Sequence, residues 1–167
     1  MPYKYLLGKN MKKILVLSIH YPPEISAGSF RMKSLLDNLK ENLNNDYVID
    51  LITTMPHKDS VNNNFELIEK NGKITIYRVP IPIDIKKGVN RIIVFFYYAW
   101  GVLKITYGKK YILIFATTAK LMTGFLAAII AALKRSFLYV DIRDIFTDTY
   151  RDLYKNSIKR IIQEKQG

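Results

Sequence analysis

The segment ILVLSIHYPPEISAGSFRM, residues 14–32, constrains the fold of this chain more than any other. Its apolar run from Ile14 to Ile19 stops at His20, a small-residue turn follows at 26–29, and a helical pattern then begins. This order predicts a buried strand, a loop that carries polar groups, and a helix N-terminus. Because open parallel sheets bind ligands beyond the carboxyl ends of their strands, the segment also predicts where a ligand would lie.

The same alternation of strand and helix patterns continues along the chain. Strands are expected at about 13–19, 47–53, 73–79, 111–116 and 137–142, and helices at about 29–42, 89–107 and 119–133. The first helix is expected to have Ser29 as its N-cap and to bury the face formed by Met32, Leu35, Leu36 and Leu39. Asn71-Gly72, between arms at 65–70 and 73–79, predicts a β-hairpin. Since the strands are near-continuous apolar runs, we predict an α/β fold, a Rossmann-like doubly wound and mainly parallel sheet with one hairpin.

Length and composition fit one such domain. We expect an N-terminal extension at 1–10, the Rossmann-like domain at 11–150, and a basic helical tail at 151–167. The hydrophobic fraction of 49% excludes disorder as the main state. The absence of cysteine excludes disulfides, thiolate metal sites and cysteine nucleophiles.

The formal net charge of +12 favours anionic partners, such as membrane lipids, nucleic acid or phosphorylated substrates. Nucleic acid is not expected, because no groove-reading motif accompanies the charge and the aromatic residues fall inside apolar runs. The uncharged segments 92–103 and 121–133 are shorter than the roughly 18 residues of a membrane span. They fit helices buried against the sheet, or shallow interfacial helices flanked by Arg91, Lys104, Lys134 and Arg135.

Several polar residues are expected at the carboxyl ends of the strands, each with two interpretations. The turn at 26–29 is either an anion site at a helix N-terminus or a plain tight turn. His20 either faces the cleft or is a hydrogen-bonded structural residue, and it is not spaced with His57 as a metal pair, so no metal is expected. G-x-G-x-x-G and Walker patterns are absent, which argues against a nicotinamide oxidoreductase.

Charged and hydroxyl residues end the last two predicted strands. Asp141 and Arg143 alternate with Ile142 and Asp144 after strand 137–142, either as a buried Asp–Arg pair or as groups that meet a sugar hydroxyl or phosphate. Thr117 and Thr118 either contribute hydroxyl groups to the same rim or cap the next helix.

Three stretches together resemble one protein family. Residues 11–32 (MKKILVLSIHYPPEISAGSFRM) resemble the opening of family-4 glycosyltransferases, the GT-B enzymes of bacterial polysaccharide assembly. Residues 77–80 (YRVP) are similar to the family's R-V-P passage, and residues 137–148 (FLYVDIRDIFTD) to its E-I-R-D-L-W-P-D stretch, although Phe146-Thr147 replaces the frequent tryptophan-proline. The stretches follow in the family's order, and the span from the first to the last takes in nearly the whole chain, residues 11–148.

The resemblance implies a GT-B N-terminal, acceptor-side domain of the retaining hexosyltransferase type, cytoplasmic and peripheral at the inner face of the membrane. The acceptor would be a lipid-linked saccharide in surface polysaccharide synthesis, and an anionic membrane surface would be a partner. The nucleotide-sugar donor would be bound mainly by a second, C-terminal glycosyltransferase domain, a separate candidate partner, so the chain is expected to be inactive alone. No cofactor or metal is implied, because helix dipoles and basic groups of that second domain stabilise the leaving diphosphate.

The resemblance also assigns site residues. Catalytic candidates are His20 at the cleft rim and Arg143 with Asp144 at its floor. Substrate-binding candidates are Glu24, Ala27, Gly28, Ser29, Arg31, Thr117 and Thr118. The alternative is a non-catalytic module that binds a partner protein or a membrane through its apolar helices, while a nucleotide-sugar epimerase or reductase is disfavoured by the missing glycine fingerprint.

Overall fold

A computed structural model of the chain describes residues 11–56, 66–81, 91–118 and 121–142. Arg143, Asp144 and the expected tail at 151–167 lie outside the described residues, as does the expected extension at 1–10. The elements are β1 (Lys12–Leu17), α1 (Ala27–Asn42), β2 (Tyr47–Thr54), β3 (Ile68–Asn71), β4 (Ile74–Val79), α2 (Arg91–Thr106), β5 (Leu113–Thr118), α3 (Leu121–Lys134) and β6 (Phe137–Ile142).

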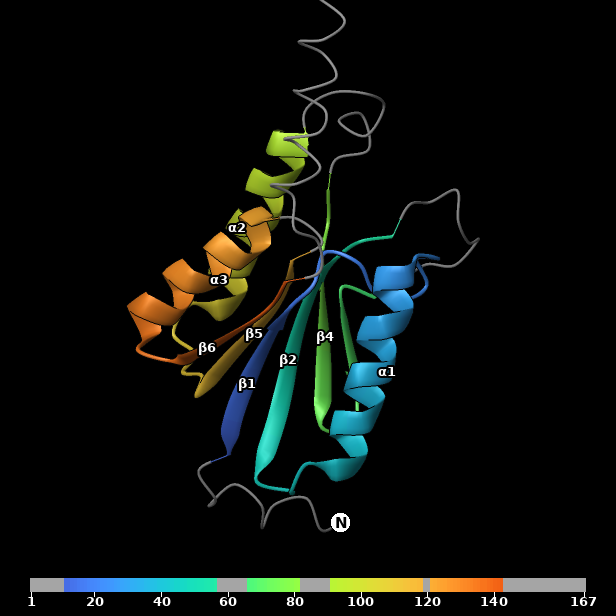
Figure 1. The fold of residues 1–167 in the computed structure, drawn as a ribbon, viewed down its shortest axis with the longest axis vertical. Coiled ribbons are helices and arrows are strands. Elements are labelled where there is room, and N and C mark those ends of the chain that lie inside the picture. Colours follow the sequence, from blue (N-terminus) through green and yellow to red (C-terminus); the bar gives the residue numbers. More distant parts are fainter. Residues whose placement is uncertain (1–10, 57–65, 82–90, 119–120, 143–167) are drawn as a thin grey trace, which may run out of the picture.

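The six strands form one sheet in the order β3-β4-β2-β1-β5-β6 (Figure 1). Every neighbouring pair is parallel except β3 and β4, which form the antiparallel hairpin. The chain starts in the middle of the sheet, builds outward through β2 and β4, and then returns to β1's other side with β5 and β6. This is the Rossmann-like, mainly parallel α/β fold that the sequence predicts, and its strand order reverses between β1 and β5.

Two apolar layers cover the sheet, with α1 on one face and α2 and α3 on the other (Figure 1). The alternation of β1 divides its side chains between the layers: Ile14 and Val16 join the α1 cluster, whereas Leu15 and Leu17 join the cluster of α2 and α3. Each such side chain contributes about 1.5–3 kcal/mol by leaving water. Period-two alternation within an almost wholly apolar strand therefore builds both cores at once.

Two local predictions are wrong. The hairpin turn is Gly72-Lys73 instead of Asn71-Gly72, because Asn71 is already paired with Ile74 and the positive φ of 62° falls on Gly72, the first turn residue. The N-cap of α1 is Ser26 instead of Ser29, since the Ser26 hydroxyl accepts from the backbone N–H of Ser29. The helix thus begins two residues earlier than expected.

The expectation that the sheet is covered on both faces fails at β6. Phe137 is 80% exposed and Tyr139, on the same face, is 59% exposed. The outer face of α3 is also apolar, with Phe125 at 66% and Leu133 at 75% exposure. The apolar helices are therefore buried on their sheet-facing side only. Of the helices in the described part of the chain, none has the length and apolar character to cross a membrane.

Candidate functional site

The loop after β1 lies at the switch point of the sheet and is fixed by hydrogen bonds. Ser18 is buried and donates from its hydroxyl to the carbonyl of His20 at 2.7 Å. The carbonyl of Ile19 accepts from the hydroxyls of Thr53 and Thr54, at 3.2 and 2.9 Å, at the carboxyl end of β2. The backbone that carries His20 is thus fixed to the neighbouring strand β2, which positions this side chain at the carboxyl edge.

His20 and Glu24 form a hydrogen-bonded pair at this edge. The His20 Nδ1 and the Glu24 Oε1 are 2.6 Å apart, and the side chains are 28% and 34% exposed. An ionised Glu24 accepts the Nδ1 proton, which leaves Nε2 of a neutral imidazole as a base. The hydrogen bond that one interpretation of His20 expects is present, and the side chain is also accessible to solvent; that it faces a ligand cleft stays a prediction.

A residue that the sequence analysis did not assign to the site positions this pair. Arg78 of β4 is buried, and its guanidinium donates to the carbonyl of Pro22 at 3.1 Å and to Glu69 Oε2 at 3.1 Å. It also lies 5.9 Å from the ring centroid of Tyr21, whose pKa is raised, first by burial and then by the charges of Asp37 and Glu69. Arg78 therefore links the segment between His20 and Glu24 to the sheet. The signal that could have indicated it is an arginine in an otherwise apolar buried strand.

The N-terminus of α1 follows the pair directly. Ala27 and Gly28 form the start of the helix, and no acidic residue lies in its first turn. Ser29 is fully buried and its backbone N–H is already bonded to Ser26, which argues against a direct contact between Ser29 and a ligand. The backbone N–H groups of Ala27 and Gly28 are the donors that an anion could meet here.

A second polar contact crosses the same edge further along the sheet. Arg31 of α1 donates to Asp141 of β6 at 3.1 Å, with side-chain exposures of 61% and 20%. Thr117 of β5 is buried and paired in register with Asp141. The structure therefore brings together His20 with Glu24, and Arg31 with Asp141 and Thr117. Asp141 forms its ion pair with a residue of another element, an arrangement that the sequence analysis did not consider.

The other predicted site residues are not placed by the structure. Arg143 and Asp144 lie outside the described residues, and the side chain of Thr118 is not described, although its backbone pairs with Ile142. Within the described ranges, no three histidine, aspartate or glutamate side chains gather as a metal site would require.

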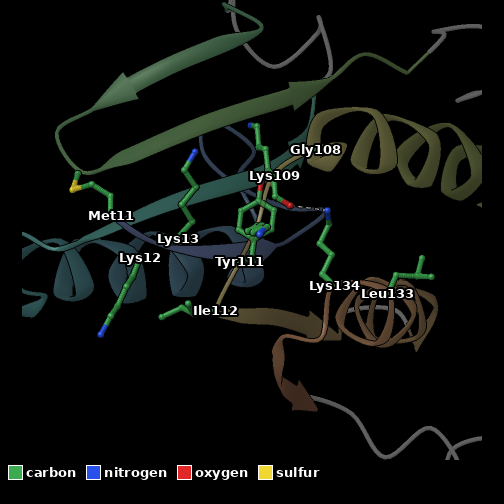
Figure 2. A pocket seen from close by; sticks show the side chains of 10 residues that line it. Met11, Lys12, Lys13, Gly108, Lys109, Tyr111, Ile112, Leu133 and Lys134 are labelled. Carbon is green, nitrogen blue, oxygen red and sulfur yellow. Dashed lines mark hydrogen bonds between the residues drawn. The ribbon is translucent and has the colours of Figure 1, made fainter. Parts of the chain in front are cut away.

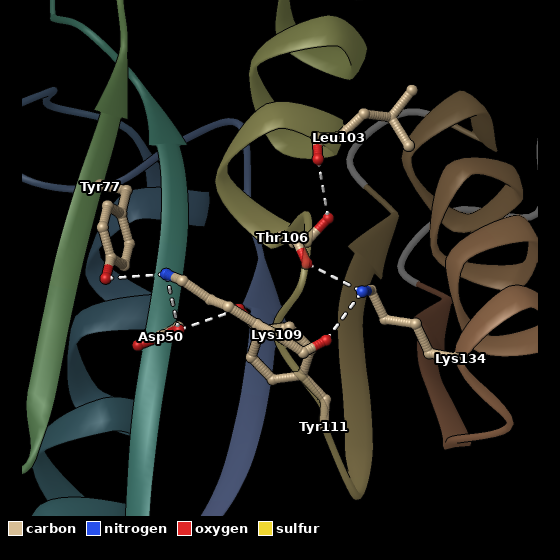
Figure 3. Close-up of polar contacts among 7 residues, drawn as sticks. All are labelled: Asp50, Tyr77, Leu103, Thr106, Lys109, Tyr111 and Lys134. Carbon is tan, nitrogen blue, oxygen red and sulfur yellow. Dashed lines mark hydrogen bonds and ion pairs between the residues drawn. The ribbon is translucent and has the colours of Figure 1, made fainter.

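A polar network at the opposite, amino edge of the sheet was missed by sequence reasoning (Figure 3). Asp50 of β2 is buried among apolar strands and accepts from Lys109 Nζ at 3.3 Å and from the Tyr111 hydroxyl at 2.9 Å. Lys109 also donates to the Tyr77 hydroxyl at 2.9 Å. Lys134, at the end of α3, donates to the backbone carbonyls of Thr106 and Lys109, both at 2.8 Å, and so binds the C-terminus of α2.

The pKa values of Lys109 and Tyr111 are both raised in this network. Burial alone would lower the pKa of Lys109, but the hydrogen bond to Tyr77 and the charge of Asp50 outweigh it and raise the pKa. Burial, followed by the nearby Asp50 carboxylate, raises the pKa of Tyr111 strongly. Lys109 is therefore held charged and Tyr111 neutral. The signal in the sequence was Asp50 inside the apolar run YVIDLIT, because a buried carboxylate requires a partner.

A pocket of about 700 Å³ lies beside this network (Figure 2). It is lined by the start of β1, the connection from α2 to β5, and the end of α3; the residues are Met11, Lys12, Lys13, Gly108, Lys109, Lys110, Tyr111, Ile112, Leu133 and Lys134. The pocket is thus at the other end of the strands from the His20–Glu24 pair.

Fold and site together define a Rossmann-like α/β domain with an ordered histidine–glutamate pair at its switch point and a lysine-rich pocket at the opposite edge. Compared with known proteins, the chain matches no family model, and no curated protein sequence matches it either.

Proposed function

We propose that this chain forms the acceptor side of a sugar-transfer site, as the N-terminal domain of a family-4 glycosyltransferase would. The observation that carries the proposal is the His20–Glu24 pair, 2.6 Å apart and partly exposed, at the carboxyl edge of the sheet. Rossmann-like sheets bind substrates at this edge. The acceptor would be a lipid-linked saccharide, and the donor a nucleotide-sugar held mainly by a second domain.

The pair would act on the acceptor hydroxyl. Glu24 would accept a hydrogen bond from Nδ1–H of His20, which leaves Nε2 free to accept the proton of the acceptor hydroxyl. The oxygen of that hydroxyl would then bond to the anomeric carbon of the donor sugar. The bond from that carbon to the diphosphate breaks, and the leaving group takes the electron pair. The backbone N–H groups of Ala27 and Gly28, at the N-terminus of α1, would face the donor phosphates.

The surface of the chain supports a location at the cytoplasmic face of a membrane. The net charge of +12 attracts anionic lipids, and the exposed apolar side chains of α3 can enter the interface. Acceptor and enzyme would then share one surface.

The test is acceptor binding by the full-length, ¹⁵N-labelled chain, followed by NMR. The probes are farnesyl-diphospho-N-acetylglucosamine and farnesyl diphosphate, which differ only in the sugar. We expect amide chemical-shift changes within residues 18–31 that occur only with the sugar-bearing probe. His20→Ala should weaken binding of this probe at least about tenfold, whereas His57→Ala, a change at the chain's other histidine, should leave the affinity unchanged. Identical shifts with both probes, or undiminished binding by His20→Ala, would refute the proposal.

The exposed apolar side chains favour a second candidate function, a non-catalytic module that docks onto a membrane or a partner protein. Phe125, Ile129 and Leu133 follow helical spacing on α3 and are 66%, 40% and 75% exposed. In this case Phe125→Ser with Ile129→Ser should abolish co-sedimentation with phosphatidylglycerol vesicles, whereas Ile25→Ser, a change of an exposed apolar residue before α1, should not. Undiminished sedimentation of the α3 variant would rule out docking through this helix.

A further inference from the structure

The lysine-rich pocket at the amino edge carries an inference separate from the acceptor site. Five of its ten lining residues are lysines, and they come from three separate parts of the chain. Figure 2 shows that the side chains of Lys109, Tyr111 and Lys134 lie together between β1 and the end of α3. Tertiary folding therefore brings lysines from three parts of the chain to the lining of one hollow.

Two of these lysines are fixed in position. Lys109 is held by Asp50 and the Tyr77 hydroxyl, and Lys134 by two backbone carbonyls. Their ammonium groups do not need to be ordered when a ligand arrives, which reduces the entropy lost on binding.

The other three lysines are not neutralised by any carboxylate that the structure describes. In the described part of the chain, no carboxylate lies within ion-pair distance of Lys12, Lys13 or Lys110. Lys12 lies over the ring of Tyr47 at 5.4 Å, on the other face of β1 from Lys13. Among the described carboxylates, Asp50 forms an ion pair with a pocket lysine, and that lysine is Lys109. A bound anion would compensate the charges of Lys13 and Lys110, which no carboxylate of the described residues neutralises.

The lysine side chains in the lining favour a phosphate group as the anion. Lysine ammonium groups bind phosphate as point charges, and several of them around one hollow suit a group with multiple negative charges. Met11, Ile112 and Leu133 add apolar walls. The ring of Tyr111 is buried and accordingly cannot stack on a nucleobase.

We propose that this pocket binds the phosphate group of a phosphorylated ligand, either a lipid headgroup or a soluble phosphate compound. Leu133 belongs both to the pocket wall and to the exposed apolar row of α3 that contains Phe125 and Ile129. A phospholipid could therefore place its headgroup among the lysines and its acyl chains along α3. A soluble phosphate compound would use the lysines alone.

The first arm of the test is calorimetric titration of the full chain with pyrophosphate. Lys13→Gln with Lys110→Gln removes two pocket charges without touching the Asp50 network. Lys40→Gln with Lys70→Gln is the matched control, because Lys40 of α1 is half-buried and Lys70 of β3 is exposed, as Lys13 and Lys110 are, respectively. We expect the pocket variant to bind pyrophosphate about tenfold more weakly than the control variant, with circular dichroism unchanged in both.

The second arm distinguishes the two sources of phosphate. The chain is sedimented with phosphatidylcholine vesicles that contain phosphatidic acid. If it co-sediments, and if pyrophosphate or the pocket variant reduces this co-sedimentation, the ligand is a lipid headgroup. If the chain binds pyrophosphate but does not co-sediment, the ligand is a soluble phosphate compound. Equal pyrophosphate affinity in the pocket and control variants would overturn the proposal, and so would binding of a single-stranded RNA at the pocket that pyrophosphate fails to displace. Neither Lys13 nor Lys110 belongs to the acceptor site, so the result of this comparison does not depend on the proposed function.

Discussion

Replacement of Lys109 by methionine should destabilise the fold far more than a change at an exposed lysine normally does. Methionine keeps the approximate length of the side chain but removes its charge. Of the two hydrogen bonds that the network gives the buried Asp50 carboxylate, only the one from the Tyr111 hydroxyl then remains. The Nζ–Oδ2 distance of 3.3 Å corresponds to about 5 kcal/mol of attraction at an effective dielectric constant of about 20.

The net loss is smaller than this attraction. The side chain of Lys109 is 26% exposed, so that part of its charge is still solvated in the folded protein, whereas that of Asp50 is only 7% exposed. We therefore expect Lys109→Met to lower the free energy of unfolding by about 3 kcal/mol. Asp50→Asn should cost only about 1 kcal/mol, because asparagine still accepts from Tyr111 and Lys109 keeps Tyr77. The double variant should lose about 2 kcal/mol, less than Lys109→Met alone.

The assay is urea unfolding of the full chain near pH 7, followed by far-ultraviolet circular dichroism. Lys110→Met is the matched control, since Lys110 is exposed and adjacent, and it should change stability by less than about 0.5 kcal/mol. If Lys109→Met behaves like this control, or if the two single changes simply add in the double variant, then Asp50 and Lys109 do not form the coupled pair described here.

Three further outcomes are expected. Ser26→Ala should lower the free energy of urea unfolding by about 1 kcal/mol through loss of the α1 cap, whereas Ser29→Ala should cost nothing, because its buried hydroxyl has no hydrogen-bond partner in the described structure. Because the pKa of Tyr111 is raised in the folded protein, the unfolded chain loses the phenol proton at a lower pH, and the free energy of unfolding should fall as pH rises above about 10. Urea unfolding of Tyr111→Phe at several pH values should show a shallower fall. An identical fall would contradict the raised pKa of Tyr111. Gly101→Ala should reduce stability by about 1–3 kcal/mol despite alanine's helix preference, because the new Cβ would lie 2.5 Å from Val79 Cγ1. A Val79→Ala background should reduce this loss in the same assay, since only the Val79 Cβ, at 3.2 Å, would remain close.

Most of the fold could be predicted from local patterns. The apolar run at 14–19 is a strand with both of its faces buried, and the hydrophobic spacing of Met32 and Leu36 marks the buried side of α1. The two local errors are a shift of one residue in the hairpin turn and of three residues in the cap of α1. Ser26 and Ser29 are equally good caps by residue type, and only the position at which the chain turns toward the sheet distinguishes them.

The candidate site was predictable at one edge of the sheet and not at the other. His20 and Glu24 are four residues apart in one loop, so a local reading places both at the carboxyl edge. The partner of Asp141 is Arg31, 110 residues earlier, and no local pattern predicts that contact. The same holds for Asp50 and Lys109, which are 59 residues apart.

The sequence by itself determined the kinds of elements, their order and the edge at which polar loop residues gather, because these depend on hydrophobic periodicity and on the chirality of parallel crossovers. Only the tertiary structure decided which charges meet. Lysines from the start of β1, the α2–β5 connection and the end of α3 line one pocket at the amino edge because β5 pairs beside β1 and α3 packs against β5. Charge–charge energies depend on distance through space, and the chain's sequence order does not encode that distance.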